Sequence, residues 1–429
     1  MGTLLFICTA LLLLIGAPIA VSLGLGGAVA IFLKGSVPLI IVPQRMFGAM
    51  DSFPLMAIPF FVLAGNLMAA GGISRRLIRF ANSLAGRVTG GLAIVSVLGG
   101  MFFAAISGSG AATTAALGTI LIPAMVSRGY NREFSTAVQA TSGAIGIIIP
   151  PSVPLVLYGI GASVSIGDLF LGGFGPGIIV GIGLMIVAYL VSRKEGYGKE
   201  EPAPAREIWA AFKDAYLALL MPVIILGGIY AGVFTPTEAA VVAVVYGFVV
   251  GALVYRELNF KQLQSVLNST VVTTAIIMFI IGCAALFAMV LTREKIPQEI
   301  AAWLLSISRN PIIILMVVNV FLLFVGCIME TAAAIIILTP ILLPIILQVG
   351  IDPVHFGIVM ITNLGIGLVT PPVGINLYVA SNIAGAKMEY VIRRTLPFLV
   401  AMIISLLLIT YIPKITLFPV ELLNSIRMK

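Results

Sequence analysis

The stretch SGSGAATTAALGTILIPAM at residues 107–125 and the stretch IMETAAAIIILTPILLPII at residues 328–346 decide the fold. Each begins with a polar or glycine-rich tetrapeptide inside apolar sequence, and their prolines Pro123 and Pro344 lie 221 residues apart. Further along, the pairs Pro150-Pro151 and Pro371-Pro372 repeat the same offset. A duplicated unit with two backbone breaks inside apolar sequence is typical of secondary transporters, which bind solute and ions where helices are interrupted.

The composition predicts an all-α polytopic membrane protein. Of the 429 residues, 60% are hydrophobic and only 9% are charged, whereas soluble domains have about 25% charged residues. The net charge of +8 is spread over short loops, so we interpret it as a topology signal and expect no nucleic-acid partner. We expect the lipid bilayer to be the principal surroundings, and the first 33 residues to be a span, not a signal peptide.

About ten segments are apolar enough to be candidate spans. They are 3–33, 36–50, 54–71, 134–163, 169–192, 216–232, 239–255, 267–291, 356–384 and 396–413.

Two further regions, 88–127 and 311–348, each contain a pair of shorter apolar runs joined only by the tetrapeptides above. Arg87 lies on one side of the first pair, and Arg128 and Arg132 lie on the other. Because basic residues favour the cytoplasm, we predict that both ends lie there and that the region is a re-entrant hairpin. Two ordinary spans joined by a tight turn are the alternative.

This topology gives two inverted repeats, residues 1–192 and 214–429, joined by a cytoplasmic linker at 193–213. It places seventeen lysines and arginines inside and six outside, with the N-terminus in the periplasm, as the positive-inside rule requires. Each repeat has scaffold spans, an amphipathic arm, a hairpin and a broken helix. The ranges are 3–71, 72–86, 88–127 and 134–163 in the first repeat, and 216–291, 294–308, 311–348 and 356–384 in the second.

The breaks predict one or two sodium sites, related by the repeat. Pro150 and Pro151 cannot donate hydrogen bonds, so carbonyl groups near Gly146 lose their helical partners. Free carbonyls and hydroxyls are hard oxygen ligands for alkali cations. The predicted metal ligands are Ser107, Ser109, Gly146 and Ile149 in the first repeat, and Gly326, Thr331, Gly367 and Thr370 in the second. In the alternative interpretation, the prolines only kink packed helices.

The tips and breaks contain no lysine, arginine or histidine. An anionic solute would therefore be held by helix N-termini and neutral polar side chains. The predicted substrate-binding residues are Ser152, Thr113, Thr114, Asn363 and Asn376.

Glu330 is the one acidic residue at a tip. It could carry a proton, bind a cation or cap the helix that begins at Thr331, and we favour the cap. His355, the only histidine, is expected to be solvated at a loop end. A phosphate-binding loop and metal-binding spacings are both missing from the sequence, so we predict that the chain is not an enzyme.

Four motifs resemble the large membrane subunit of tripartite ATP-independent periplasmic (TRAP) transporters, most closely its sialic-acid members. They are the 107–125 stretch, GIIIPPSVP at 146–154, VFTPTEAA at 233–240 and GIGLVTPPVGINLY at 365–378. The resemblance implies a bacterial inner-membrane protein with a small four-helix membrane partner subunit and a periplasmic substrate-binding protein. It also implies sodium-coupled uptake of an acidic solute by an elevator mechanism, with Na⁺ bound at two or more sites.

Sialic acid is the favoured solute and a C4-dicarboxylate the next. A proton-coupled transporter or antiporter using Glu330 is the main alternative, and a non-transporting membrane anchor is a third. Polar breaks argue against the anchor, because an anchor has no need of them.

Overall fold

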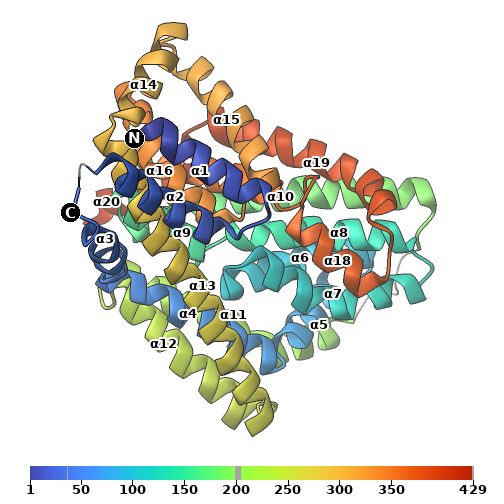
Figure 1. Ribbon diagram of the computed structural model, residues 1–429. Coiled ribbons are helices and arrows are strands. Elements are labelled where there is room, and N and C mark those ends of the chain that lie inside the picture. The colour runs from blue at the N-terminus through green and yellow to red at the C-terminus, as the bar shows by residue number, and fades with distance from the viewer. Residues whose placement is uncertain (36, 199–203, 428–429) are drawn as a thin grey trace.

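The computed structural model describes residues 1–35, 37–198 and 204–427, and these residues form helices joined by short connections (Figure 1). In chain order the elements are α1 (Gly2–Leu14), α2 (Ile19–Lys34), α3 (Ile41–Met50), η1 (Phe53–Met56), α4 (Ala57–Ala70), α5 (Ile73–Ala85), α6 (Gly91–Ser107), α7 (Gly110–Ser127), α8 (Arg132–Ala144), η2 (Ile145–Ile147), α9 (Val153–Ala162), α10 (Ile166–Glu195), α11 (Ala205–Tyr230), α12 (Pro236–Phe248), η3 (Val249–Val254), α13 (Phe260–Arg293), α14 (Ile296–Ile307), α15 (Pro311–Ile328), α16 (Thr331–Gln348), α17 (Pro353–Gly367), α18 (Ile375–Ala384), α19 (Met388–Tyr411) and α20 (Lys414–Arg427). Within the described ranges, nine helices are long and apolar enough to cross a membrane.

The N-terminal region departs from the prediction. The single span expected over 3–33 is wrong, because the chain breaks into α1 and α2, which pack against each other. Gly16 takes a left-handed conformation with φ of +83°, and Pro18, the N-cap of α2, has no N–H to continue a helix. The span expected over 36–50 is also wrong in length, since its helix α3 covers only Ile41–Met50.

The hairpins and broken helices appear in the same order in both halves. Helices α6 and α7 are joined at Gly108 and Ser109, and α15 and α16 at Met329 and Glu330. Helix α8 continues through η2 to the first proline pair before α9 begins, and α17 and α18 flank the second pair. Of the predicted linker 193–213, residues 199–203 lie outside the described residues, between the ends of α10 and α11.

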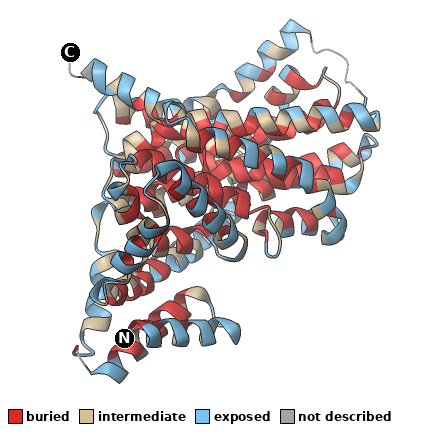
Figure 2. Cartoon of the chain, turned by 90° about the horizontal axis from the view of Figure 1, so that it is seen from above, coloured by how far each residue is buried: buried red, intermediate tan, exposed pale blue. Residues whose placement is uncertain are grey.

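The two halves are interleaved. Helix α16 of the second hairpin packs against α9, while α18 packs against α7 and α8 of the first half. A second group of helices surrounds α13, which contacts α2, α3 and α4, and α4 in turn packs against α12. Buried residues concentrate in the interior of the molecule, and exposed ones on its outer helices (Figure 2). We call the hairpins and broken helices the central block, and α2, α4, α12 and α13 the scaffold.

Two peripheral features complete the fold. The amphipathic segments 72–86 and 294–308 contain α5 and α14, which precede the two hairpins. The sequence prediction missed α20, a helix after the last span that packs against α10 and α17.

Candidate functional site

The proline pairs leave equivalent carbonyl groups without helical partners, and the chain beyond each break supplies new donors. Pro151 and Pro372 have no N–H for the carbonyls of Ile147 and Leu368, which lie 221 residues apart. The Ser152 hydroxyl donates to the Ile147 oxygen at 2.6 Å. The Asn376 N–H donates to the Leu368 oxygen at 3.0 Å. Both prolyl pairs contain a cis peptide bond.

Each hairpin tip caps the helix that follows it. Ser109 accepts from the Ala112 N–H through its hydroxyl at 3.4 Å, and Glu330 accepts from the Ala333 N–H through its carboxylate at 3.1 Å. Both caps use the third residue of the helix, as is usual for N-caps. In addition, the negative charge of Glu330 is favourable at a helix N-terminus.

The first tip forms a cluster of oxygen atoms against the first break. The hydroxyls of Ser107 and Thr113 lie 2.8 Å apart, and the Thr113 hydroxyl donates to the Ser109 carbonyl at 2.8 Å. A Cβ at Gly146 would lie 2.7 Å from both the Ser109 oxygen and the Thr113 hydroxyl, so only glycine permits this approach. The tip and the break therefore meet, and their oxygen atoms are of the type that binds Na⁺.

The second tip has a different chemistry. At the positions equivalent to Ser107 and Thr113, it has the apolar residues Ile328 and Ala334. Helices α15 and α17 cross closely here, because a Cβ on Gly367 would lie 2.6 Å from the Cα of Gly326. The Thr370 hydroxyl is already bonded to the Ile366 carbonyl at 2.7 Å. The second half thus offers one carboxylate and backbone oxygens in place of a hydroxyl cluster.

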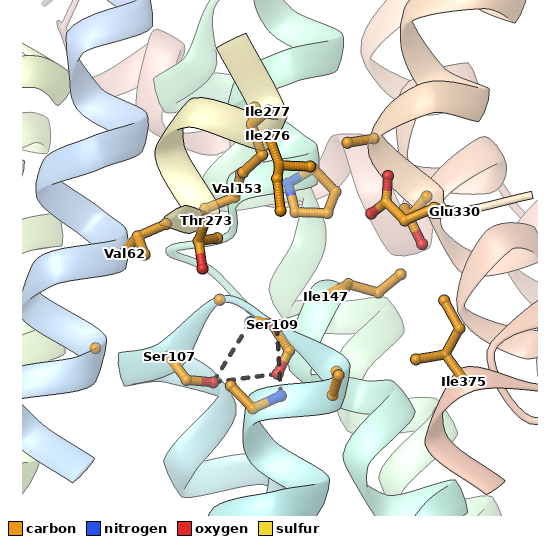
Figure 3. Close-up of a pocket in the computed structure, with 18 of the residues that line it drawn as sticks. Val62, Ser107, Ser109, Ile147, Val153, Thr273, Ile276, Ile277, Glu330 and Ile375 are labelled. Carbon is orange, nitrogen blue, oxygen red and sulfur yellow. Dashed lines mark hydrogen bonds between the residues drawn. The ribbon is translucent and has the colours of Figure 1, made fainter. Parts of the chain in front are cut away.

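Both tips open into one cavity of about 460 Å³. In Figure 3, Ser107 and Ser109 lie on one side of this cavity and the Glu330 carboxylate on another. The remaining walls come from both breaks and from the scaffold helices α4 and α13. Besides Glu330, the polar side chains on the lining are Asn66, Ser107, Ser109, Ser269, Thr273 and Thr331. The charge of this lining comes from one carboxylate, and its other polar groups are neutral.

The predicted site residues divide into two groups. Ser107, Ser109, Thr331 and Glu330 line the cavity. The others are not among the residues that line the cavity. They are Gly146, Ile149, Gly326, Gly367, Thr370, Ser152, Thr113, Thr114, Asn363 and Asn376.

Asn363 and Asn376 have packing contacts that the sequence did not reveal. Asn363 lies away from the cavity, where its amide donates to the Asn319 side chain at 2.9 Å, between α17 and α15. Its prediction as a substrate-binding residue is not supported, because its side chain faces α15. Asn376 donates to the Ala140 carbonyl at 3.2 Å and so connects α18 to α8.

His355 is buried, with only 2% of its surface exposed, so the expectation of a solvated histidine is wrong. Its Nδ1 lies 2.7 Å from the Thr416 hydroxyl, and its Nε2 lies 3.1 Å from the Thr410 carbonyl. The reason is α20, which the sequence prediction missed and which supplies Thr416.

The scaffold side of the cavity was also missed. Asn66 on α4 donates to the Thr270 hydroxyl on α13 at 3.0 Å, and Ser269 and Thr273 beside it reach the lining. A signal existed in the sequence, since residues 269–274 read STVVTT within an otherwise apolar span. Polar residues gathered at one depth of a membrane helix indicate a polar partner or a water-filled cavity.

Comparisons with known proteins agree on one family. Residues 6–415 match the model of the DctM component of tripartite ATP-independent periplasmic transporters. The chain is 46% identical over 396 residues to the C4-dicarboxylate TRAP transporter large permease protein DctM of Pseudomonas aeruginosa, covering 92% of this chain and 93% of that one. It is 41% identical over 411 residues to the sialic acid large permease SiaM of Vibrio cholerae, covering 96% of each chain.

A further relative is the isethionate TRAP transporter permease protein DctMQ of Oleidesulfovibrio alaskensis, 48% identical over 410 residues. The match covers 95% of this chain but only 65% of that longer relative. Among solved structures, the YdaH transporter of Alcanivorax borkumensis has a TM-score of 0.62 at 16% identity, with 86% of each chain covered. At that identity the likeness concerns the fold alone.

Proposed function

Because the chain belongs to the DctM component family of tripartite ATP-independent periplasmic transporters, we propose that it carries a small acidic organic solute into the cell, driven by sodium. As a large permease subunit it is a transporter component and not an enzyme. The observation that carries the proposal is that both hairpin tips and both helix breaks line the same cavity. Interrupted helices around one cavity provide oxygen ligands for cations and helix N-termini for an anion together.

Sodium coupling rests on the first tip. The Thr113 hydroxyl lies 2.8 Å from the Ser107 hydroxyl and 2.8 Å from the Ser109 carbonyl oxygen. A hydroxyl and carbonyl cluster without a carboxylate suits a monovalent cation better than Mg²⁺ or Zn²⁺. We propose one Na⁺ at this tip and another at the Gly326–Gly367 crossing, where the Gly326 carbonyl group lies against Gly367.

The proposal of an acidic solute rests on the helix N-termini around the cavity. Helices α7 and α16 begin at its edge, and the N-terminus of α9 contributes Val153 and Pro154. Helix N-termini bind anions without a basic side chain. Bound Na⁺ would also offset the negative charge of Glu330. Related permeases are named for isethionate, C4-dicarboxylate, sialic acid and 2,3-diketo-L-gulonate, all of them acidic.

The choice among these solutes remains a proposal. The sequence motifs favour sialic acid, whereas the isethionate and C4-dicarboxylate permeases, at 48% and 46% identity, are more similar to this chain than the 41% identical sialic acid permease. We therefore propose a small carboxylate or sulfonate as the solute class, with sialic acid as one member to be tested.

The partners follow from the family. We propose a small four-helix membrane subunit, a periplasmic substrate-binding protein that delivers the solute, and a location in the bacterial inner membrane with the N-terminus in the periplasm. The exposed apolar side chains of the outer helices fit a lipid or membrane-subunit contact. We further propose an elevator movement, in which the central block slides past α4 and α13.

Uptake into proteoliposomes tests this proposal. Vesicles containing the permease with its membrane subunit receive solute-loaded binding protein, and a sodium gradient or a proton gradient is applied alone. We expect uptake of labelled sialic acid, succinate or isethionate with the sodium gradient only. Uptake driven by protons alone, and abolished by Glu330→Gln, would replace the sodium model with the proton-coupled alternative.

A further inference from the structure

Two groups of charged residues lie where the chain enters the arms α5 and α14. They connect these places to α11, to α2 and to the chain between η3 and α13. We propose that Arg76 with Glu257, and Glu294 with Lys34, are permanent clamps that fix the place where each arm leaves the scaffold during transport. This inference rests on the proposed transport function and assigns positioning roles to residues outside the cavity.

The first clamp centres on Arg76 in α5. Its guanidinium donates to the Glu257 carboxylate at 2.7 Å and to the Gly72 carbonyl at 2.9 Å. It also lies 3.3 Å from the Asp214 carboxylate and stacks 3.6 Å above the Tyr255 ring. The arm, α11 and the chain after η3 therefore meet at one side chain, which is only 16% exposed. Several contacts at a half-buried arginine are stronger than an isolated surface ion pair.

Gly72 shows how closely this arm approaches the scaffold. It has a φ of +78°, and any Cβ there would collide with the Glu257 carboxylate. The neighbouring Gly71 packs backbone to backbone, since a Cβ on it would lie 3.0 Å from the Cα of Gly251 in η3. Glycines allow this contact because they leave room for the facing chain and permit a left-handed backbone.

The second clamp centres on Glu294, immediately before α14. Its carboxylate accepts from Lys34 at 3.2 Å, from the Gly2 N–H at 3.1 Å and from the N-terminal amine at 2.9 Å. These hydrogen bonds, that of the amine first, lower the pKa of Glu294 to about 2. Its negative charge therefore persists across the physiological pH range.

The two clamps lie near equivalent turns of the internal repeat, although their charged residues are not at equivalent positions, since Lys34 and Arg76 correspond to Tyr255 and Pro297. Gly35 after α2 and Arg256 after η3 both have left-handed backbones, and they lie 221 residues apart. Beside these turns lie Lys34 and Glu257, each paired with a charged residue of the other half. In the first clamp the positive charge is on the arm, at Arg76, whereas in the second the negative charge is on Glu294, the C-cap of α13 just before the arm.

The clamps lie at opposite ends of α13. Glu257 precedes this helix and Glu294 follows it, and its 34 residues span about 50 Å at 1.5 Å per residue. In Figure 1, α14 lies at the top and α5 in the lower half. Each hairpin is therefore attached through its arm to a different end of the scaffold. Movement of the block must then occur at the far ends of the arms, at 86–91 and 308–310.

Cross-linking tests whether the clamps stay closed. Cysteines replace Lys34 and Glu294, or Arg76 and Glu257, after Cys8, Cys283 and Cys327 have been changed to serine. A short bis-maleimide then joins each pair in proteoliposomes. Because the double cysteine variant lacks the ion pair, we expect cross-linking to raise its uptake towards the rate of the unmodified permease. Loss of uptake on cross-linking would overturn the proposal, because it would mean that the clamp opens in each cycle.

Breaking a clamp gives the complementary test. Glu257→Gln should lower the maximal uptake rate roughly tenfold, as expected for the loss of one charged hydrogen bond. The sodium and solute concentrations that give half-maximal uptake should not change. The matched control is Arg75→Gln, because Arg75 is 76% exposed and lies 4.0 Å from the same carboxylate. Unchanged uptake by Glu257→Gln would overturn the clamp.

Hydrogen exchange separates this inference from the proposed function. Amides 73–85 should exchange roughly tenfold faster in Glu257→Gln than in Arg75→Gln, and no solute is needed for this measurement. Equal exchange rates in the two variants would overturn the clamp. Lack of sodium-driven uptake by the unmodified protein would reject the proposed function and leave the exchange result as the test of the clamp.

Discussion

Ser109 and Glu330 occupy equivalent positions at the two tips, yet they give those tips different electrostatic properties. Both cap the following helix through its third residue. The hydroxyl cap leaves the first tip neutral and surrounded by oxygen atoms, whereas the carboxylate cap places a negative charge on the cavity wall. We therefore expect ion binding at the first tip to depend on hydroxyls, and binding near the second tip to depend on charge.

Removing one hydroxyl from the first tip tests this expectation. Ser107→Ala deletes a group that contacts Thr113 at 2.8 Å. We expect the sodium concentration for half-maximal uptake to rise about fivefold, corresponding to roughly 1 kcal/mol for one ligand contact. Ser127→Ala is the matched control, because that exposed hydroxyl bonds only its own helix. Sodium titrations of uptake that coincide for the two variants would remove Ser107 from the site.

At the scale of the helices, length does not decide whether a hairpin spans the membrane. Helix α7 has 18 residues and therefore a length of about 27 Å, close to the roughly 30 Å hydrocarbon core. The charges at the hairpin ends instead indicate on which side of the membrane each end lies. Arg87 and Arg128 are exposed at the two ends of the first hairpin, and Arg309 is exposed at the start of the second.

Cysteine labelling tests whether the hairpins re-enter from opposite sides. In a background without native cysteines, Arg87→Cys and Gly129→Cys should react only with a reagent added on the cytoplasmic side. Arg309→Cys and Gly350→Cys should react only from the periplasm. All four positions are exposed, so accessibility of the side chain does not limit the reaction. Labelling of 87 and 129 from opposite sides would mean that the first hairpin crosses the membrane.

At the scale of the whole molecule, the cavity lies between two groups of helices. On one side each hairpin packs against the broken helix of the other half, through α16 with α9 and α18 with α7. On the other side are α4 and α13, which are held together by Asn66 and Thr270. An elevator movement would preserve the first set of contacts and change those across the cavity.

A pair of cross-links distinguishes the two sets of contacts. Gly161 and Thr339 join α9 to α16 within the block, with Cβ positions 3.7 Å apart, which suits a disulfide. Gly65 on α4 faces the first tip, where its Cβ would lie 3.1 Å from the Cα of Ser107. Oxidising cysteines at 161 and 339 should leave uptake unchanged, whereas joining cysteines at 65 and 107 should stop it.

The reduced 65/107 double variant is the control for that experiment, because it carries the same substitutions without the bond. If uptake persists when 65 and 107 are joined, the first tip does not travel past α4, and a rocking or gating movement should replace the elevator.

The sequence by itself determined the features that depend on neighbouring residues. Proline has no N–H, so Pro150-Pro151 and Pro371-Pro372 interrupt their helices wherever they pack, and the cap at Glu330 needs only the N–H groups that follow it. The constant offset of 221 residues revealed the duplication. Apolar composition similarly identified a helical membrane protein. The break at Gly16–Pro18 also depends on neighbouring residues. The sequence prediction missed it because the apolar run over 3–33 is long enough for a single span.

Only the tertiary structure decided which faces of these helices meet. The pairing of Asn66 with Thr270, the burial of His355 beside Thr416 and the orientation of Asn363 towards α15 each join residues tens to hundreds of positions apart. Hydrophobic periodicity is weak in helices that are apolar on all sides, so it cannot assign one face to the protein and another to lipid. The cavity and the two clamps exist because packing brings separate halves of the chain together.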